Sequence, residues 1–227
     1  MKILAIDTSA KSAGVALTDG RRPIAVYTQN VGLTHSETIL PMIEALLKNA
    51  KTDIDQIDMF ACTVGPGSFT GVRIGVSTIK GLAFGKNKIC VGVSTLESLA
   101  RNIKVKNSVI VPVIDARQSR LYNAVFTYDG EKYIRITDDK TSTAAELADE
   151  IQKYGSGIYY VGDGYDIINQ VAPSSVETPE ILKLPSGYST AVAALEKYEL
   201  TENKEIFKDT LLFPEYLRPS QAERSIS

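Results

Sequence analysis

A glycine-rich turn is the first stretch of this sequence whose residue types could do chemistry. TVGPGSFTGVRIG, residues 63–75, follows an apolar strand-like run and leads into a predicted helix, a layout that often holds a phosphate at the helix N-terminus. The glycines at 65, 67 and 71 have the spacing G-x-G-x-x-x-G, which differs from the dinucleotide pattern G-x-G-x-x-G, and no G-K-[S/T] follows. The turn is therefore not predicted to bind a nucleotide as a P-loop or a Rossmann turn does.

Two aspartates, Asp7 and Asp115, each end a strand-like run, ILAID and VPVID. Carboxylates at these positions could coordinate Mg²⁺ across a cleft between two domains, or they could cap the turns that follow them. The chain continues with TS and AR, so neither aspartate is followed by a glycine that would let backbone amides approach a phosphate. No cofactor is predicted. An ATPase or kinase that uses Asp7 and Asp115 stays as the alternative hypothesis.

Side chains for metal or nucleophilic chemistry are scarce. His35 is the only histidine, and with Glu37 it offers two ligands, fewer than a closed metal site requires. Cys62 and Cys90 lie within apolar runs, where burial raises the pKa of a thiol, and in a reducing compartment they are expected to stay free. No G-x-S-x-G motif is present. We therefore predict no catalytic residue and no metal site.

Strands and helices alternate along the first third of the chain and would position these residues. The expected elements are strands at 3–6, 13–18 and 23–28, a helix after the capping box THSE, a strand at 59–64, a helix at 68–84, a strand at 89–93 and a helix after Ser94.

A similar order recurs in the second half. VPVID follows ILAID by about 110 residues, and in each half a second strand ends in Asp-Gly. A third strand at 133–136, a helix at 144–154 and a strand at 158–164 complete the match. We expect an α/β fold built from a duplicated βββαβα unit, with domains at 1–103, which carries the dimerisation helices, and 104–227.

Such a duplicated unit is similar to the two ribonuclease-H-like halves of the actin-like ATPase superfamily. Within it, ILAIDTS, HSETILPMI, GPGSFTGVRIG, GVSTLESLA, PVIDAR and PEYLR resemble the TsaB (YeaZ) family over nearly the whole chain. The resemblance implies a non-catalytic scaffold that supports a TsaD-type transferase in the N6-threonylcarbamoylation of adenosine 37 in tRNA. It also implies contact with a TsaE-type ATPase through that heterodimer, a homodimer when alone, and tRNA binding only through the complex.

The resemblance also bears on metal binding. TsaD-type subunits carry two metal-binding histidines four residues apart on the helix after a GV strand, and the matching positions here are Thr95 and Leu99. Leucine has no lone pair to donate, so this metal site cannot form. A metallopeptidase, the second alternative, is disfavoured for the same reason.

The helices expected at 34–49 and 68–84 are more apolar than one buried face requires. Two glycines inside the second helix cost ~1 kcal/mol each relative to alanine, which close approach by another helix could offset. From the residues alone, internal packing and a partner surface are both open. The resemblance favours a partner surface, on which Ile43→Glu or Gly75→Leu should give a folded monomer. It is expected to comprise Ser36, Ile39, Leu40, Ile43, Leu47, Ser68, Gly71, Val72, Gly75 and Ile79.

Composition sets the remaining expectations. The 227 residues carry a formal net charge of −2, which excludes a general attraction to polyanions. No apolar run reaches the roughly 18–20 residues that cross a bilayer, and the N-terminus reads as a strand, so we expect a cytoplasmic protein without membrane contact. A tRNA contact through DARQSR, residues 115–120, stays a hypothesis. Tyr216 and Leu217 are expected to dock, and the residues after them to be mobile.

Overall fold

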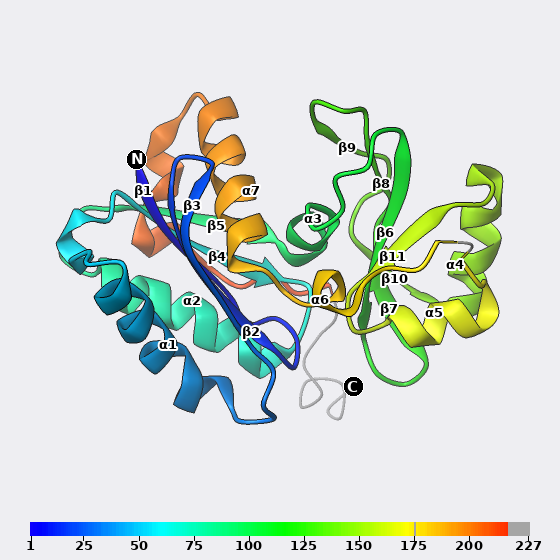
Figure 1. Cartoon of the computed structure of the whole chain (residues 1–227), viewed down its shortest axis with the longest axis horizontal. Coiled ribbons are helices and arrows are strands. Elements are labelled where there is room, and N and C mark those ends of the chain that lie inside the picture. The colour runs from blue at the N-terminus through cyan, green and yellow to red at the C-terminus, as the bar shows by residue number, and fades with distance from the viewer. Residues whose placement is uncertain (175, 218–227) are drawn as a thin grey trace.

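The computed structural model of the protein describes residues 1–174 and 176–217, and it consists of two α/β lobes side by side (Figure 1). The expectation for the chain after Leu217 lies outside the described residues.

A five-stranded sheet forms the centre of the first lobe, in the order β3-β2-β1-β4-β5. Its strands are β1 (Lys2–Asp7), β2 (Ala13–Asp19), β3 (Arg22–Gln29), β4 (Met59–Gly65) and β5 (Ile89–Ser94). The first three pair antiparallel, while β4 and β5 run parallel to β1. β1 and β4 are almost entirely apolar because helices cover both faces of the sheet.

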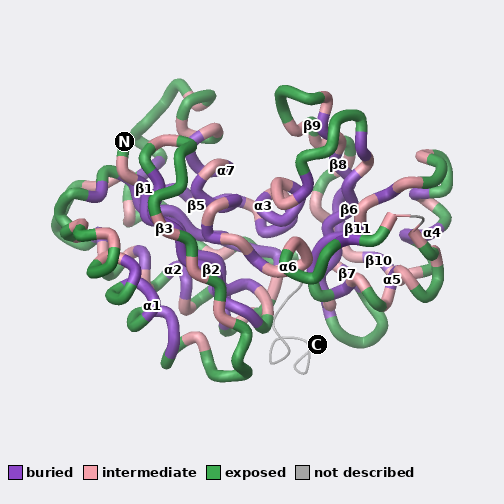
Figure 2. The backbone as a smooth tube through the Cα atoms, viewed as in Figure 1, coloured by how far each residue is buried: buried purple, intermediate pink, exposed green. Residues whose placement is uncertain are grey.

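Two long helices, α1 (His35–Asn49) and α2 (Phe69–Ala83), pack on one face of this sheet. The predicted capping box begins α1, with the Thr34 amide donating to Glu37 Oε2 at 3.2 Å. Ser68 Oγ caps α2 by accepting from the Gly71 amide at 3.2 Å. Figure 2 shows the resulting division, with buried positions on the sheet side of each helix and exposed positions on the outer side.

The opposite face is covered by α7 (Gly187–Leu200), together with the 3₁₀ helix Lys204–Phe207. The small residues Ala191 and Ala194 of α7 pack in one cluster with Ala5 and Ala61 of the sheet. A helix from the end of the chain thus completes the first lobe. The predicted domain boundary at 103/104 lies between the strands of the two sheets, but α7, which comes after it, packs on the first lobe. The boundary itself stays a prediction.

The second lobe follows the predicted order with additional elements. Its elements are β6 (Ser108–Asp115), β7 (Arg120–Asn123), β8 (Phe126–Tyr128), β9 (Tyr133–Arg135), β10 (Lys140–Thr143), α4 (Ala144–Ile151), β11 (Ile158–Val161), α5 (Tyr165–Val171) and α6 (Glu180–Lys183). One strand was predicted after Asp115, but the structure has two, β7 and β8. Both pair antiparallel with β6, and the register is the same for the two strands. β10 was not predicted because KTST has no apolar alternation.

The short helix α3 (Thr95–Ala100) lies between the lobes, and the remaining 3₁₀ helices are Ile54–Gln56, Gln152–Tyr154 and Asp209–Leu211. Within residues 1–174 and 176–217, no helix combines the length and apolar character that a membrane span needs.

Candidate functional site

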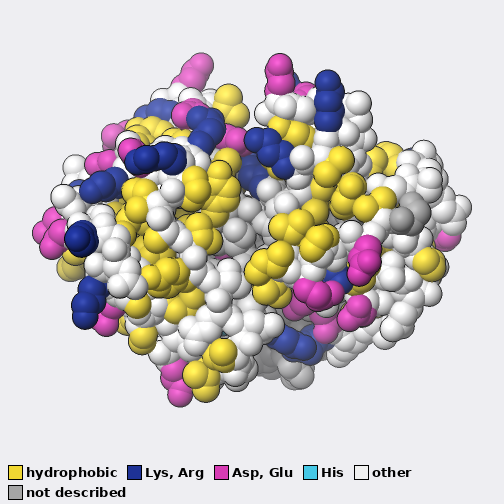
Figure 3. Space-filling model, in the orientation of Figure 1, with side chains coloured by type: hydrophobic (Ala, Val, Ile, Leu, Met, Phe, Trp, Pro, Cys, Tyr) yellow, Lys and Arg dark blue, Asp and Glu magenta, His cyan; other side chains and the backbone are white. Residues whose placement is uncertain are grey.

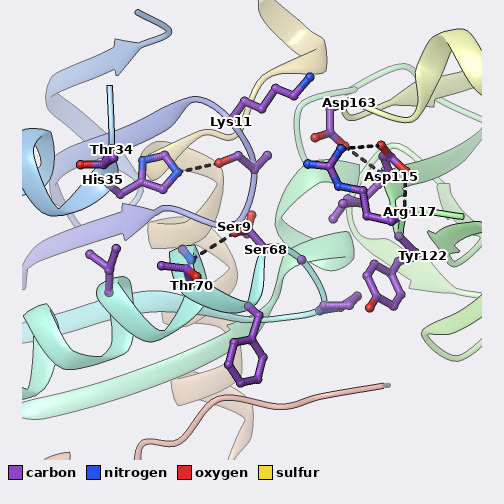
Figure 4. Close-up of a pocket in the computed structure, with 18 of the residues that line it drawn as sticks. Ser9, Lys11, Thr34, His35, Ser68, Thr70, Asp115, Arg117, Tyr122 and Asp163 are labelled. Carbon is purple, nitrogen blue, oxygen red and sulfur yellow. Dashed lines mark hydrogen bonds and ion pairs between the residues drawn. The ribbon is translucent and has the colours of Figure 1, made fainter. Parts of the chain in front are cut away.

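A cavity of about 740 Å³ lies between the lobes (Figure 4). The first lobe contributes the β1–β2 loop with Ser9 and Lys11, and the start of α2 with Ser68. The second lobe contributes Asp115 at the end of β6 and Tyr122 on β7. Strand ends and a helix N-terminus therefore meet across the cavity, and in open α/β sheets such a crevice at the strand ends is where ligands generally bind.

Asp7 does not reach this cavity. Its side chain is fully buried, and Oδ1 accepts hydrogen bonds from the amide and hydroxyl of Ser9, at 3.0 and 2.6 Å, and from Thr63 Oγ1 at 3.0 Å. Oδ2 has no partner among the described residues. Burial raises the pKa of the Asp7 carboxyl, and the hydrogen bonds oppose that shift in part. This arrangement is that of a turn cap, and it leaves Asp7 unavailable to a cation in the cavity.

Asp115 lines the cavity, but its carboxylate is occupied by its own loop. Oδ1 accepts from the Arg117 amide at 2.8 Å, and Oδ2 lies 3.5 Å from the Arg117 guanidinium. The structure thus does not bring Asp7 and Asp115 together in the cavity, and the ATPase hypothesis loses its pair of ligands. Across the described part of the chain, no group of three or more His, Cys, Asp or Glu side chains is placed to hold a metal ion.

Sequence reasoning missed Asp163, which lies beside Asp115 in the cavity. Its Oδ1 accepts from the Asp115 amide at 3.0 Å. Burial, and then the neighbouring Asp115 carboxylate, raises the pKa of Asp163. The motif GDG directly after β11 is the signal that could have revealed it.

The other residues considered for chemistry have structural places. The His35 ring nitrogen Nε2 lies 2.6 Å from the carbonyl oxygen of Ala10, which ties α1 to the β1–β2 loop. Thr95 and Leu99 are buried in α3. Both cysteines are free and buried, and burial raises the pKa of the Cys90 thiol to about 12.

The glycines of the turn and of α2 allow the β1–β2 loop of the same chain to approach closely. A Cβ at Gly67 would lie 2.5 Å from the carbonyl oxygen of Ser9, and one at Gly71 would lie 2.1 Å from that of Thr8. At Gly75 a Cβ would meet Thr8 Oγ1 at 2.5 Å, and this hydroxyl donates to the Gly71 carbonyl at 2.8 Å. The expectation that Gly71 and Gly75 serve the docking of another chain is therefore corrected, because the β1–β2 loop already fills the space.

The predicted partner surface divides in two. Six of its members are buried in the core of the first lobe: Ile39, Ile43, Gly71, Val72, Gly75 and Ile79. Ser36, Leu40 and Ser68 are exposed, and Leu47 is half-buried. Leu40 keeps 47% of its surface exposed, whereas Ile43, one turn on, keeps 2%. The apolar excess of α1 thus serves mainly its own sheet, and the outer stripe is narrower than the sequence suggested.

An open groove of about 460 Å³ runs between the outer faces of α1 and α2. Leu40 and Ile39 line it from α1, while Phe69, Arg73 and Ile74 line it from α2. Arg73 and Ile74 were missed because the apolar stripe read from the sequence ran through positions 72, 76 and 79, which face the sheet.

Comparison with known proteins identifies the family. The chain matches the family model "TsaD: tRNA N6-adenosine threonylcarbamoyltransferase" over residues 26–226. It is 34% identical to tRNA threonylcarbamoyladenosine biosynthesis protein TsaB of Escherichia coli, over 73% of this chain and 72% of that protein. The TsaB of Bacillus subtilis is 28% identical over 98% of this chain and 96% of its own.

A solved structure, YeaZ from Pseudomonas aeruginosa, has the same fold, with a TM-score of 0.79 at 24% identity over 95% of this chain and 99% of that one. This likeness confirms the predicted α/β fold. By sequence similarity over most of both chains, the protein belongs to the TsaB family of tRNA threonylcarbamoyladenosine biosynthesis proteins.

Proposed function

We propose that the protein is the non-catalytic subunit that binds a TsaD-type transferase and supports its N6-threonylcarbamoylation of adenosine 37 in tRNA. The observation that carries this proposal is the open groove between α1 and α2. Leu40 stays 47% exposed there after both helices have buried their inner faces in a complete core. An apolar groove left open by a closed core favours contact with a second polypeptide.

Likeness between the two chains supports a TsaD-type transferase as the partner. The transferase family model matches residues 26–226, so a TsaD-type chain has segments that correspond to both α1 and α2. Two chains with similar helix pairs can pack them about a pseudo-two-fold axis, as identical subunits do about a true one. The same groove would form a homodimer when the transferase is absent.

The proposed complex also assigns the transfer chemistry to the partner. Asp7 is enclosed, and Leu99 stands where the resemblance to TsaD-type subunits implies a metal-binding histidine, which supports a transfer step carried out by the partner. Basic and acidic side chains are interspersed on the face shown in Figure 3, which supports tRNA binding through the complex instead of by this chain alone. A TsaE-type ATPase would join through the heterodimer, and the complex would be cytoplasmic.

Leu40→Glu tests the proposal because it places a charge in the groove at a position the fold leaves exposed. Leu200→Glu is the matched control, since Leu200 is an 84% exposed helical leucine on α7, which covers the opposite face of the sheet. We expect Leu40→Glu to weaken binding of the host's TsaD-type protein at least about tenfold in calorimetry, a cost of about 1.4 kcal/mol. Equal affinity for both variants would refute the assigned groove.

A further inference from the structure

Arg73 is held in a fixed orientation at the rim of the α1–α2 groove. Its guanidinium carbon lies 3.7 Å from the centroid of the Phe69 ring and 5.6 Å from that of Tyr216. The two rings stack with their centroids 4.9 Å apart, and Arg73 Nε donates to the Tyr216 hydroxyl at 2.7 Å. Stacking and a hydrogen bond together restrict a side chain that would otherwise be free to rotate.

Tyr216 reaches Arg73 because the end of the described chain returns along α2. The Glu215 amide donates to the Val64 carbonyl at 2.7 Å, and Lys80 Nζ donates to the Leu212 carbonyl at 3.2 Å. Leu212 is itself buried in the core of the first lobe. We call residues 212–217 the C-terminal strap. It is anchored on β4 and on α2, so the ring of Tyr216 is fixed against Phe69 and Arg73, which line the groove.

The terminal nitrogens of Arg73 have no polar partner within residues 1–174 and 176–217. Its one hydrogen bond to another described residue is made by Nε, and neither Nη1 nor Nη2 forms a hydrogen bond or an ion pair there. Arg21, Arg101 and Arg135, by contrast, each form an ion pair with a carboxylate of this chain. Arg73 is exposed, and its planar fork matches a carboxylate, which can accept two parallel hydrogen bonds.

We infer that Arg73 is a specificity-determining residue of the groove, and that it binds an Asp or Glu carboxylate of the transferase subunit. This inference rests on the proposed function. The floor beneath Arg73 is apolar, formed by Ile39, Leu40 and Ile74, and a polypeptide would fill it. A nucleic-acid phosphate would satisfy the guanidinium but leave that floor exposed. The orientation fixed by Phe69 and Tyr216 lowers the entropy lost when the ion pair forms.

Three variants separate the parts of this arrangement. Arg73→Gln removes the charge, Arg73→Lys keeps the charge but loses the fork, and Tyr216→Phe removes only the hydroxyl that accepts from Nε. Arg22→Gln is the control: it makes the same charge change on β3, at the other edge of the sheet from the strands beneath α2. Affinity for the host's TsaD-type protein is measured over a salt series, with melting temperatures of each variant.

We expect Arg73→Gln to weaken binding about 10- to 100-fold at low salt and to flatten its dependence on salt, at an unchanged melting temperature. Arg73→Lys should weaken it about tenfold and Tyr216→Phe about threefold, while Arg22→Gln should behave as wild type. If Arg73→Gln and Arg22→Gln have the same affinity and salt dependence, the inference is overturned. It is also overturned if Arg73→Gln lowers only the affinity of the complex for tRNA. The proposed function is tested separately, by whether Leu40→Glu weakens binding of the TsaD-type protein.

Discussion

Replacing Gly71 by alanine should destabilise the protein, although alanine is the better helix former. The added Cβ would lie 2.1 Å from the Thr8 carbonyl oxygen, a backbone atom that cannot rotate away. Overpacking of this kind costs about 1–3 kcal/mol, and loss of the hydrogen bond from Thr8 Oγ1 to the Gly71 carbonyl costs about 1 kcal/mol more. A gain of about 1 kcal/mol in helix propensity offsets only part of this. The net loss in the free energy of unfolding is about 1–3 kcal/mol.

Gly81→Ala in the same helix is the matched control. Nothing lies within 4 Å of a Cβ at Gly81, so the variant gains helix propensity without a clash and should be more stable by up to about 1 kcal/mol. Urea unfolding measures both changes. In thermal melts, the two should shift the midpoint in opposite directions, by about 2–4 °C per kcal/mol for a chain of this size. Equal shifts of the same sign would refute the explanation that Gly71 exists to admit the β1–β2 loop.

Three further predictions concern buried groups and the cavity. Ile43→Glu should lose its far-UV circular dichroism signal or aggregate because Ile43 is only 2% exposed, whereas Leu40→Glu should stay folded. If Ile43→Glu is a well-folded monomer, Ile43 belongs to the partner surface as first predicted. The raised pKa of Asp7 means that the folded state keeps a proton that the unfolded state releases, so unfolding becomes easier as pH rises from about 3.8 through the raised pKa. Urea melts of Asp7→Asn should show a smaller loss over that range than wild type, and an identical pH profile would contradict the assignment. Calorimetry of the isolated chain with MgATP should show no micromolar binding; binding that Asp7→Ala abolishes would revive the ATPase alternative.

The elements of the first lobe that precede residue 101 could be predicted because each has a local signal. Capping residues mark where α1, α2 and α3 begin, and continuous apolar runs mark the strands buried on both faces. The prediction of a duplicated βββαβα unit rested on the aspartates and Asp-Gly turns that recur in both halves.

What could not be predicted depends on contacts between distant segments. The sequence indicated that another segment packs closely against Gly71 and Gly75. It does not say whether that segment is a partner's helix or the β1–β2 loop of the same chain. The division of α1 into an inner and an outer face depends on the rotation of the helix on its sheet. The C-terminal strap and α7 return to the first lobe from more than a hundred residues away, and no local pattern records that return.

The most direct test of the central claim is a threonylcarbamoylation assay reconstituted from the host's transferase, its TsaE-type ATPase, tRNA and an activated threonylcarbamoyl donor. We predict modification with the wild-type chain and with Leu200→Glu, and little or none when the chain is omitted or replaced by Leu40→Glu. Full modification with Leu40→Glu, or without the chain, would contradict the account.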